Sequence, residues 1–271
     1  MWRYLTICLA FLAFCAIVNV AYIARSNDAL TTKLHELDQM RNGKNTPFDE
    51  VEKRGKELLA EYTTPEEQAQ IYYELTEMHG QTGMVHADLV VQYAQKALAL
   101  PVDAFQRFRL YVFWGDAIFI GNIHKPTQQQ TPFYEIRKVA VRPYLEGLKE
   151  MQAYKIPEQR PNFPGVDSYD IVAPENSPVY QRFKKQHDDQ MAARKKAEFD
   201  EKLWSSHQTL MNAVVDLYSK KPYAATELRQ IATKTLADPA EVDALMKRIE
   251  ANGALKDDPI PEKANPQTPN K

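Results

Sequence analysis

The stretch Asp103–Ile120 reads DAFQRFRLYVFWGDAIFI, and it is the most apolar and aromatic of the helical segments that this sequence predicts. At 3.6 residues per turn its large side chains fall on nearly all sides of a helix; the aromatic ones are Phe105, Phe108, Tyr111, Phe113, Trp114 and Phe119. All-round apolarity is typical of a central, buried helix, because a surface helix keeps one polar face. We therefore expect these aromatic side chains to pack in a core, with a lipid or ligand groove as the alternative.

Start and stop signals of further helices flank this stretch. Thr64-Pro65-Glu66-Glu67 has the pattern of a capping box, and Asp238-Pro239-Ala240-Glu241 repeats it. Gly80 and Gly83 predict a turn before a helix over 85–100, and Pro143 predicts a break or kink in the helix that begins at Phe133. Alternating apolar and polar runs are few. The sequence thus predicts an all-α fold.

An uncharged apolar run, residues 4–24, lies between Arg3 and Arg25. As a helix it would be about 31 Å long at roughly 1.5 Å per residue, which matches a bilayer core. A signal peptide has a shorter apolar region, and a cut after Ala24 would leave bulky Tyr22 at the third position back. We predict a membrane segment in residues 1–25, either a retained signal-anchor or a cleaved signal peptide.

The charges around the run give opposing signals about its orientation. Arg3 favours a cytoplasmic N-terminus, whereas Arg25 and Lys33 oppose it. The habit of short N-terminal anchors favours an exported body, so we expect a membrane-anchored protein with that body outside the cytoplasm, or a secreted or periplasmic protein after cleavage. Both cysteines, Cys8 and Cys15, lie in the run, which excludes disulfides and thiol nucleophiles from the rest of the chain.

Composition and motifs exclude several function classes. The chain has 34 Lys or Arg against 36 Asp or Glu, so no strong positive field would attract nucleic acid. It contains no Gly-rich phosphate loop, no G-x-S-x-G motif and no dinucleotide fingerprint. Neither His35-Glu36 nor His187-Asp188-Asp189 has metal-ligand spacing, and His79 with His86 lacks a third ligand. We predict no catalytic residue, no metal and no cofactor.

The segment Val90–Pro101, VVQYAQKALALP, resembles the second helix of a tetratricopeptide repeat. The next helix has Tyr111, Trp114-Gly115 and Ile118, which is similar to the first-helix pattern of large residues around a small one, and Tyr144–Lys149 resembles a second helix again. Tyr93 and Tyr144 are 51 residues apart rather than about 34. The resemblance covers roughly residues 48–151 and implies helical hairpins with a concave surface that binds peptides or proteins; an unrelated irregular helical bundle is the alternative.

These signals divide the chain into six segments. Residues 1–25 are the signal-anchor or signal peptide, 26–45 a juxtamembrane helix and linker, and 46–152 the helical-repeat-like domain. A Pro-rich crossover follows over 153–178, then a long charged helix and a C-terminal helical hairpin over 179–256, and a disordered tail over 257–271. The expected architecture is therefore tetratricopeptide-like hairpins or an irregular bundle, with an N-terminal membrane segment and one long charged helix.

The C-terminal hairpin, residues 223–255, has a layout similar to a winged helix-turn-helix. Its second helix carries Glu241, Asp243 and Glu250 against Lys247 and Arg248, so it lacks the basic face that DNA binding requires. We expect the hairpin to cap the fold.

These observations favour a non-catalytic envelope or secreted protein that binds another protein as a scaffold or assembly factor. We expect the partner to contact the surface beside Tyr93, Tyr111 and Trp114, and the long helix 179–219. One alternative is a small-ligand binder or an enzyme whose site the sequence does not reveal. Another is a cytoplasm-facing helix-turn-helix protein that binds nucleic acid.

Overall fold

The structure, a computed structural model, describes residues 29–41, 47–81, 83–166, 174–218 and 225–252. Every regular element in these ranges is helical, so the all-α prediction is confirmed. The chain forms two compact units, residues 1–102 and 103–271. The division between them falls inside the segment 46–152 that we expect to form one domain.

Two of the predicted segments lie outside the described residues: the apolar run 4–24 and the tail 257–271. Tyr169–Val172 of the Pro-rich crossover also lie outside the described residues; their sequence favours a short strand and a partner-docking segment equally. Over the described ranges, no helix combines the length and the apolarity that a membrane crossing requires.

The first unit contains a helical segment over residues 29–41, followed by α2 (Phe48–Glu61), α3 (Pro65–Gln81) and α4 (Ala87–Leu98). Their apolar faces meet in one core, made of Leu30, Leu34, Leu37, Val51, Leu58, Tyr62, Ile71, Leu75, Met78 and Tyr93. The expected juxtamembrane helix therefore packs into a core rather than serving only as a linker. This follows from the helical spacing of its three leucines, each at most 6% exposed.

Local signals place the ends of α3 well. The Thr64 backbone N–H donates to Glu67 Oε2 at 3.2 Å, and the Glu67 N–H donates to Thr64 Oγ1 at 3.3 Å, which is the predicted capping box. Of the two glycines predicted for the following turn, Gly80 lies in the last turn of α3, whereas Gly83 lies in the turn together with Met84; their φ angles are +71° and +61°. Gly83 adopts this left-handed conformation without steric cost.

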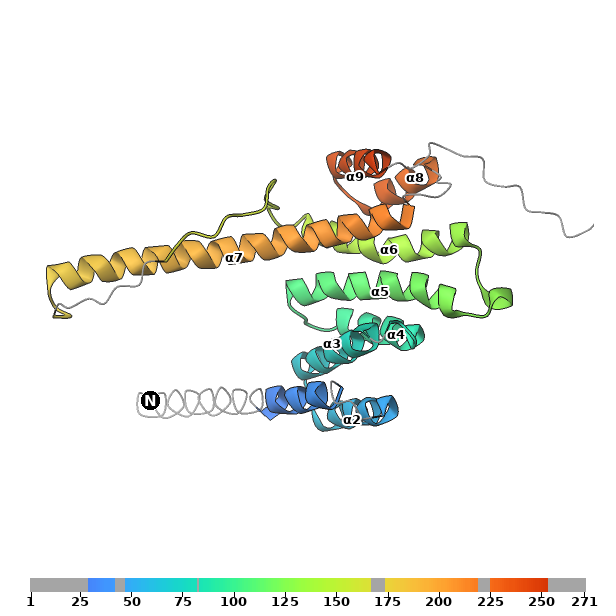
Figure 1. Cartoon of the computed structure of the whole chain (residues 1–271), viewed down its shortest axis with the longest axis horizontal. Helices are drawn as coiled ribbons and strands as arrows, with labels where there is room; N and C mark the ends of the chain where they lie inside the picture. Colours follow the sequence, from blue (N-terminus) through green and yellow to red (C-terminus); the bar gives the residue numbers. More distant parts are fainter. Residues whose placement is uncertain (1–28, 42–46, 82, 167–173, 219–224, 253–271) are drawn as a thin grey trace, which may run out of the picture. The chain divides into compact units, whose positions relative to one another are not determined.

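The second unit is built on α5 (Ala104–His124) and α6 (Phe133–Met151), which pack against each other and against α7 (Pro178–Tyr218), as Figure 1 shows. A short 3₁₀ turn, η1 (Thr127–Gln129), lies in the connection, and Asn122 closes this loop through two hydrogen bonds with the backbone of Thr131. α8 (Ala225–Thr235) and α9 (Pro239–Ala251) form the C-terminal hairpin, which packs on α6 and α7.

Two predictions about α5 and α6 need correction. α6 continues through Pro143 without a break, because packing against α5, α7 and α8 offsets the hydrogen bond that proline cannot donate. The expected burial of α5 on all sides is not observed either: Phe108 and Tyr111 are buried, but Phe113 and Trp114 are only half-buried.

The α5–α6 interface depends on two tyrosines that pack over two glycines. A Cβ atom on Gly115 would lie 2.3 Å from the ring of Tyr144, and one on Gly147 would lie 3.1 Å from Cβ of Tyr111. The two helices therefore approach closely at the small residues that the resemblance to tetratricopeptide repeats emphasises. Such close hairpins also occur in ordinary bundles, so membership of that family stays a prediction.

Candidate functional site

Tyr93, the first of the three predicted partner-binding residues, lies in the core of the first unit and is 3% exposed. Its hydroxyl donates to Glu52 Oε1 at 2.5 Å, and His79 Nε2 lies 2.7 Å from the other oxygen of the same carboxylate. Lys56 Nζ completes the group at 3.0 Å from Glu52 Oε1. Burial alone would raise the pKa of Glu52, but the bonds from His79, Tyr93 and Lys56 outweigh it and lower that pKa to about 2.

The ionised state of Glu52 determines which atom donates in its hydrogen bond with His79. An ionised Glu52 can only accept hydrogen bonds, so the Nε2 atom of His79 carries the proton that is shared between them. The ring of Phe48 packs against both His79 and His86, with ring centroids 4.7 Å and 4.4 Å away. Phe48 thus packs on the rings of both histidines, while the Glu52 carboxylate bonds to Nε2 of His79.

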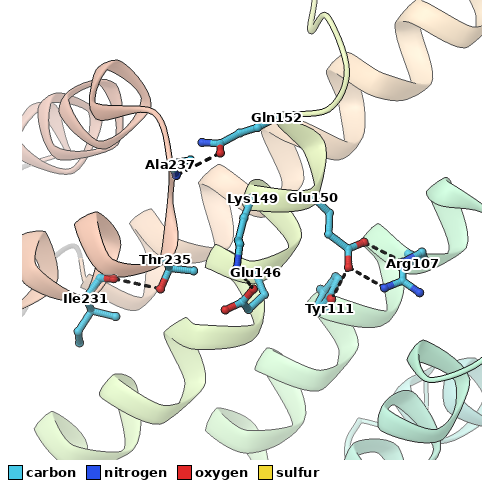
Figure 2. A network of polar contacts seen from close by, with 9 residues as sticks. All are labelled: Arg107, Tyr111, Glu146, Lys149, Glu150, Gln152, Ile231, Thr235 and Ala237. Carbon is cyan, nitrogen blue, oxygen red and sulfur yellow. Dashed lines mark hydrogen bonds and ion pairs between the residues drawn. The ribbon is translucent and has the colours of Figure 1, made fainter.

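Tyr111 lies in the second unit, where its hydroxyl donates to Glu150 Oε1 at 2.7 Å (Figure 2). Arg107 grips the same carboxylate with two bonds, from Nε at 2.7 Å and from an η nitrogen at 2.6 Å. These bonds from Arg107 are the main reason why the pKa of Glu150 is lowered, and burial opposes them only in part. Glu150 is the last acid of α6, and Arg107 lies in the first turn of α5, so the pair ties together the two ends that meet there.

Trp114 is half-buried, and its ring stacks on that of Tyr111 at a centroid distance of 6.4 Å. The structure therefore brings Tyr111 and Trp114 together but places Tyr93 in the other unit. Both tyrosines direct their hydroxyls to carboxylates of their own unit, Glu52 and the half-buried Glu150, because an unbonded phenol in a core would be costly. Trp114 is the one member of the predicted set with part of its side chain at the surface.

The other predicted partner surface, the long helix, extends as expected and forms α7. All its buried side chains lie between Leu203 and Tyr218, where α7 contacts α5, α6 and α9. Residues 178–198, which we call the α7 arm, have none, and Figure 1 shows this part of α7 extending past the ends of α5 and α6. At roughly 1.5 Å per residue, the arm is about 31 Å long.

The α7 arm is basic and carries exposed apolar side chains. It contains six Lys or Arg against three Asp or Glu, whereas the whole chain has 34 against 36. Val179 is 54% exposed and Met191 is 37% exposed. Since apolar side chains on an exposed basic helix gain stability by burial against a complementary surface, the arm has the composition of a docking element.

The Pro-rich crossover lies along one side of α7. Arg160 donates to Glu201 at 3.0 Å and stacks over the ring of Trp204, and Pro164 faces the arm across a shallow cleft of about 440 Å³ that Arg182 and Asp189 also line. The crossover in this way covers part of the arm and leaves its other faces exposed.

The C-terminal hairpin is held to the bundle by polar bonds that the sequence did not indicate. Asp238 caps α9 by accepting from the Ala240 N–H at 2.8 Å, as predicted. Glu241 does not close the capping box; it accepts from Gln152 at 2.6 Å instead. Gln152 also accepts from the Ala237 N–H, as Figure 2 shows. Gln152, Glu241 and His207 line a cavity of about 520 Å³ at this junction.

Arg248, one of the two basic residues of α9, donates to Gln208 at 2.7 Å and to Asn212 at 2.6 Å on α7. It therefore helps to fasten the hairpin. Within the described ranges, no three His, Cys, Asp or Glu side chains come together as a metal site.

Sequence reasoning missed the buried acid Glu52 and the half-buried acid Glu150. The available signal was their position: each lies on the apolar face of its helix, Glu52 beside Val51 and Gly55, and Glu150 beside Gly147 and Met151. An acid in such a stripe needs a buried partner, which helical periodicity does not identify.

Comparisons with protein-family models, with curated proteins and with solved structures find no match to this chain.

Proposed function

We propose that this chain is a non-catalytic helical protein that binds another protein as a scaffold or assembly factor, and that the α7 arm makes the contact. The observation that carries the proposal is the arm itself: 21 residues of one continuous helix without a buried side chain of its own. A helix of that length in water gains little stability from its own hydrogen bonds. Packing against a partner is the ordinary way in which such a helix contributes to function.

The partner that this surface fits is a protein with an acidic face. Lys184, Lys185, Lys195 and Lys196 extend the positive charge along the arm, and Val179 and Met191 supply apolar contacts. Complementary charge steers such partners together and fixes their register, while the apolar side chains contribute most of the stability. Trp114 is a candidate for a second contact within the same unit.

The sequence supports a location for this interaction. Residues 4–24 have the length and apolarity of a bilayer-spanning helix, so we propose an envelope protein whose body is exported, or a secreted or periplasmic protein if the segment is cleaved. The tetratricopeptide-like pattern over residues 48–151 belongs to the same proposal, because arrays of that kind bind proteins without catalysis.

Site-specific photo-crosslinking in cells tests the proposal. A benzophenone side chain at Met191 should yield a defined protein adduct, which mass spectrometry identifies, and the same group at Val139 of α6 should not. Val139 is the matched control because it is also exposed, at 48%. The identified partner should then bind the purified full-length chain, and charge reversal in the double variant K195E/K196E should weaken binding by roughly tenfold or more.

The matched control for charge reversal is K234E/K247E, which changes the same net charge on exposed positions of α8 and α9. Equal binding of the partner by both double variants would refute the role of the arm. An arm that binds anionic vesicles or duplex DNA with strong salt dependence, and no protein, would refute a protein partner.

A further inference from the structure

A cavity of about 450 Å³ lies between α5, α6 and α7 of the second unit, outside the α7 arm. Its apolar walls come from Val112, Phe119 and Ile120 of α5 and Leu217 of α7. Its polar lining comes from three helices: Asp116 of α5, Tyr144 of α6, and Thr209, Asn212 and Asp216 of α7. Of these side chains, only the two aspartates are acidic. An apolar cavity of this size with a few convergent polar groups is typical of a small-ligand site.

Asp116 is the central group of this cavity. Its Oδ1 atom accepts one hydrogen bond, from the Tyr144 hydroxyl at 2.6 Å. Gly115 makes the bond possible, because only a residue without Cβ leaves room for the Tyr144 ring beside Asp116. Among the described residues, no Lys, Arg or His lies within ion-pair distance of this carboxylate.

That lack of a cation distinguishes Asp116 from the other two carboxylates that accept from buried tyrosines. Glu52 has Lys56, and Glu150 has Arg107. Burial accordingly raises the pKa of Asp116, and the bond from Tyr144 opposes this only in part. A buried carboxylate without a cation is costly, and a bound cation would remove that cost.

We propose that this cavity binds an aliphatic ammonium ion, with the charged nitrogen on Asp116 and the hydrocarbon chain against Val112, Phe119 and Ile120. The proposal does not depend on the role of the α7 arm. Ammonium fits better than guanidinium, because Tyr144 already occupies one carboxylate oxygen and prevents the two-bond grip that guanidinium prefers. A divalent metal ion fits poorly, since it needs more oxygen ligands than these two carboxylates supply.

Asp216 sets the expected shape of the ligand. It is exposed at the rim of the cavity, and its charge is close enough to Tyr144 to contribute, after burial and Asp116, to raising the pKa of that phenol. A second positive group on the ligand would find Asp216 there. An alkyl diamine and the side chain of a lysine share the required chemistry.

Calorimetry and thermal unfolding of the full-length chain test the site with cadaverine (1,5-diaminopentane) as the probe and pentane-1,5-diol as the uncharged control. Cadaverine should bind and raise Tm with the logarithm of its concentration, and the diol should do neither. D116N should weaken cadaverine binding by roughly 10- to 100-fold, the effect of losing a charge-assisted bond. E250Q, which neutralises an exposed acid of α9, should leave binding unchanged.

Nα-acetyl-lysine methylamide distinguishes the two sources of the ammonium group. Tighter binding of this compound than of cadaverine would assign the site to a polypeptide side chain, and the reverse would assign it to a free diamine. If neither compound binds, or if D116N binds cadaverine as tightly as the unchanged chain does, the proposal is wrong.

A second measurement keeps the test decisive should D116N unfold. Cadaverine titrated into the unchanged chain should shift the methyl NMR signals of Val112 and Ile120 and spare those of Val139, which is exposed elsewhere on α6. Unshifted signals at Val112 and Ile120 would overturn the proposal.

Discussion

The α5–α6 interface contains two tyrosine–carboxylate bonds that look alike and differ in one respect. Tyr111 donates to Glu150 at 2.7 Å and Tyr144 donates to Asp116 at 2.6 Å, and each tyrosine packs over a glycine of the opposite helix. Glu150 is also gripped by Arg107, whereas Asp116 faces a cavity. The pKa of Glu150 is therefore lowered, mainly by Arg107, and that of Asp116 is raised by burial.

The comparison shows that the same local bond can serve two purposes. With its cation present, the Glu150 group is complete and joins two helix ends. The Asp116 carboxylate has no cation beside it, and it lines a cavity. The Tyr93–Glu52 bond of the first unit belongs with the completed kind, because the Glu52 carboxylate is paired with Lys56.

The largest expected effect is the loss of stability of the first unit when low pH protonates Glu52. The pKa of Glu52 is lowered from 4.5 to about 2 in the folded state, so its stabilisation is present above about pH 4.5 and disappears as the pH falls towards 2. A shift of this size corresponds to about 3 kcal/mol. Urea unfolding followed by far-UV circular dichroism from pH 7 to pH 3 should show this loss, and E52Q should show a flatter profile.

The control for this measurement is E50Q, which neutralises an exposed acid on the same helix. It should leave the pH profile as it is in the unchanged chain. A profile for E52Q as steep as that of E50Q would mean that Glu52 and its three partners do not stabilise the first unit.

The next largest effect is expected from a substitution at Gly115 that disturbs the position of Tyr144 beside Asp116. In Gly115→Ala the new methyl group would lie 2.3 Å from Cε1 and Cζ of the Tyr144 ring, so the ring must leave Asp116 or the helices must separate. We expect a loss of at least about 2 kcal/mol from this overpacking. Trp114 and Trp204 both lie in the second unit, so urea unfolding followed by tryptophan fluorescence in a Trp2→Phe background measures it.

Gly165→Ala provides the matched control, because nothing lies within 4 Å of the added atom. It should cause no loss of stability. An equally small effect of Gly115→Ala would show that the close α5–α6 approach at Gly115 is not required.

The smallest effect tests the comparison most directly, because neutralising Glu150 and neutralising Asp116 should change the stability of the second unit in different directions. Glu150→Gln removes the charge that Arg107 needs, and should destabilise the second unit by about 1–2 kcal/mol. Asp116→Asn keeps an acceptor for Tyr144 but removes an uncompensated charge, so it should be neutral or stabilise by up to about 1 kcal/mol at pH 7. The same tryptophan fluorescence measurement applies, and a loss of similar size in both variants would remove the distinction.

Much of the local structure could be predicted from the sequence. The capping box at Thr64 and Glu67 forms as predicted, because its four positions specify both bonds without help from the rest of the chain. The long helix runs from Pro178 to Tyr218, within one residue of the expected 179–219. The leucines at 30, 34 and 37 share one face, as their spacing requires.

Predictions failed where a distant residue changed the outcome. Glu241 has the sequence context of a capping box but accepts from Gln152, which lies 89 positions earlier in the chain. Pro143 does not break α6, because neighbouring helices stabilise this segment in helical form. Tyr93 and Tyr111, beside which we expect a partner to bind, are themselves buried and bonded to acids 41 and 39 positions away.

The sequence by itself therefore determined the helices, most of their ends, the basic character of the α7 arm and the apolar run at 4–24, since all of these depend on residues within a few turns of one another. Tertiary structure alone decided which half-buried carboxylate receives a cation. Arg107 reaches Glu150 across the α5–α6 interface, and no described basic side chain reaches Asp116. The physical reason is that helical periodicity reports which face is buried, whereas ion pairing depends on distances between atoms that the chain brings together only when it folds.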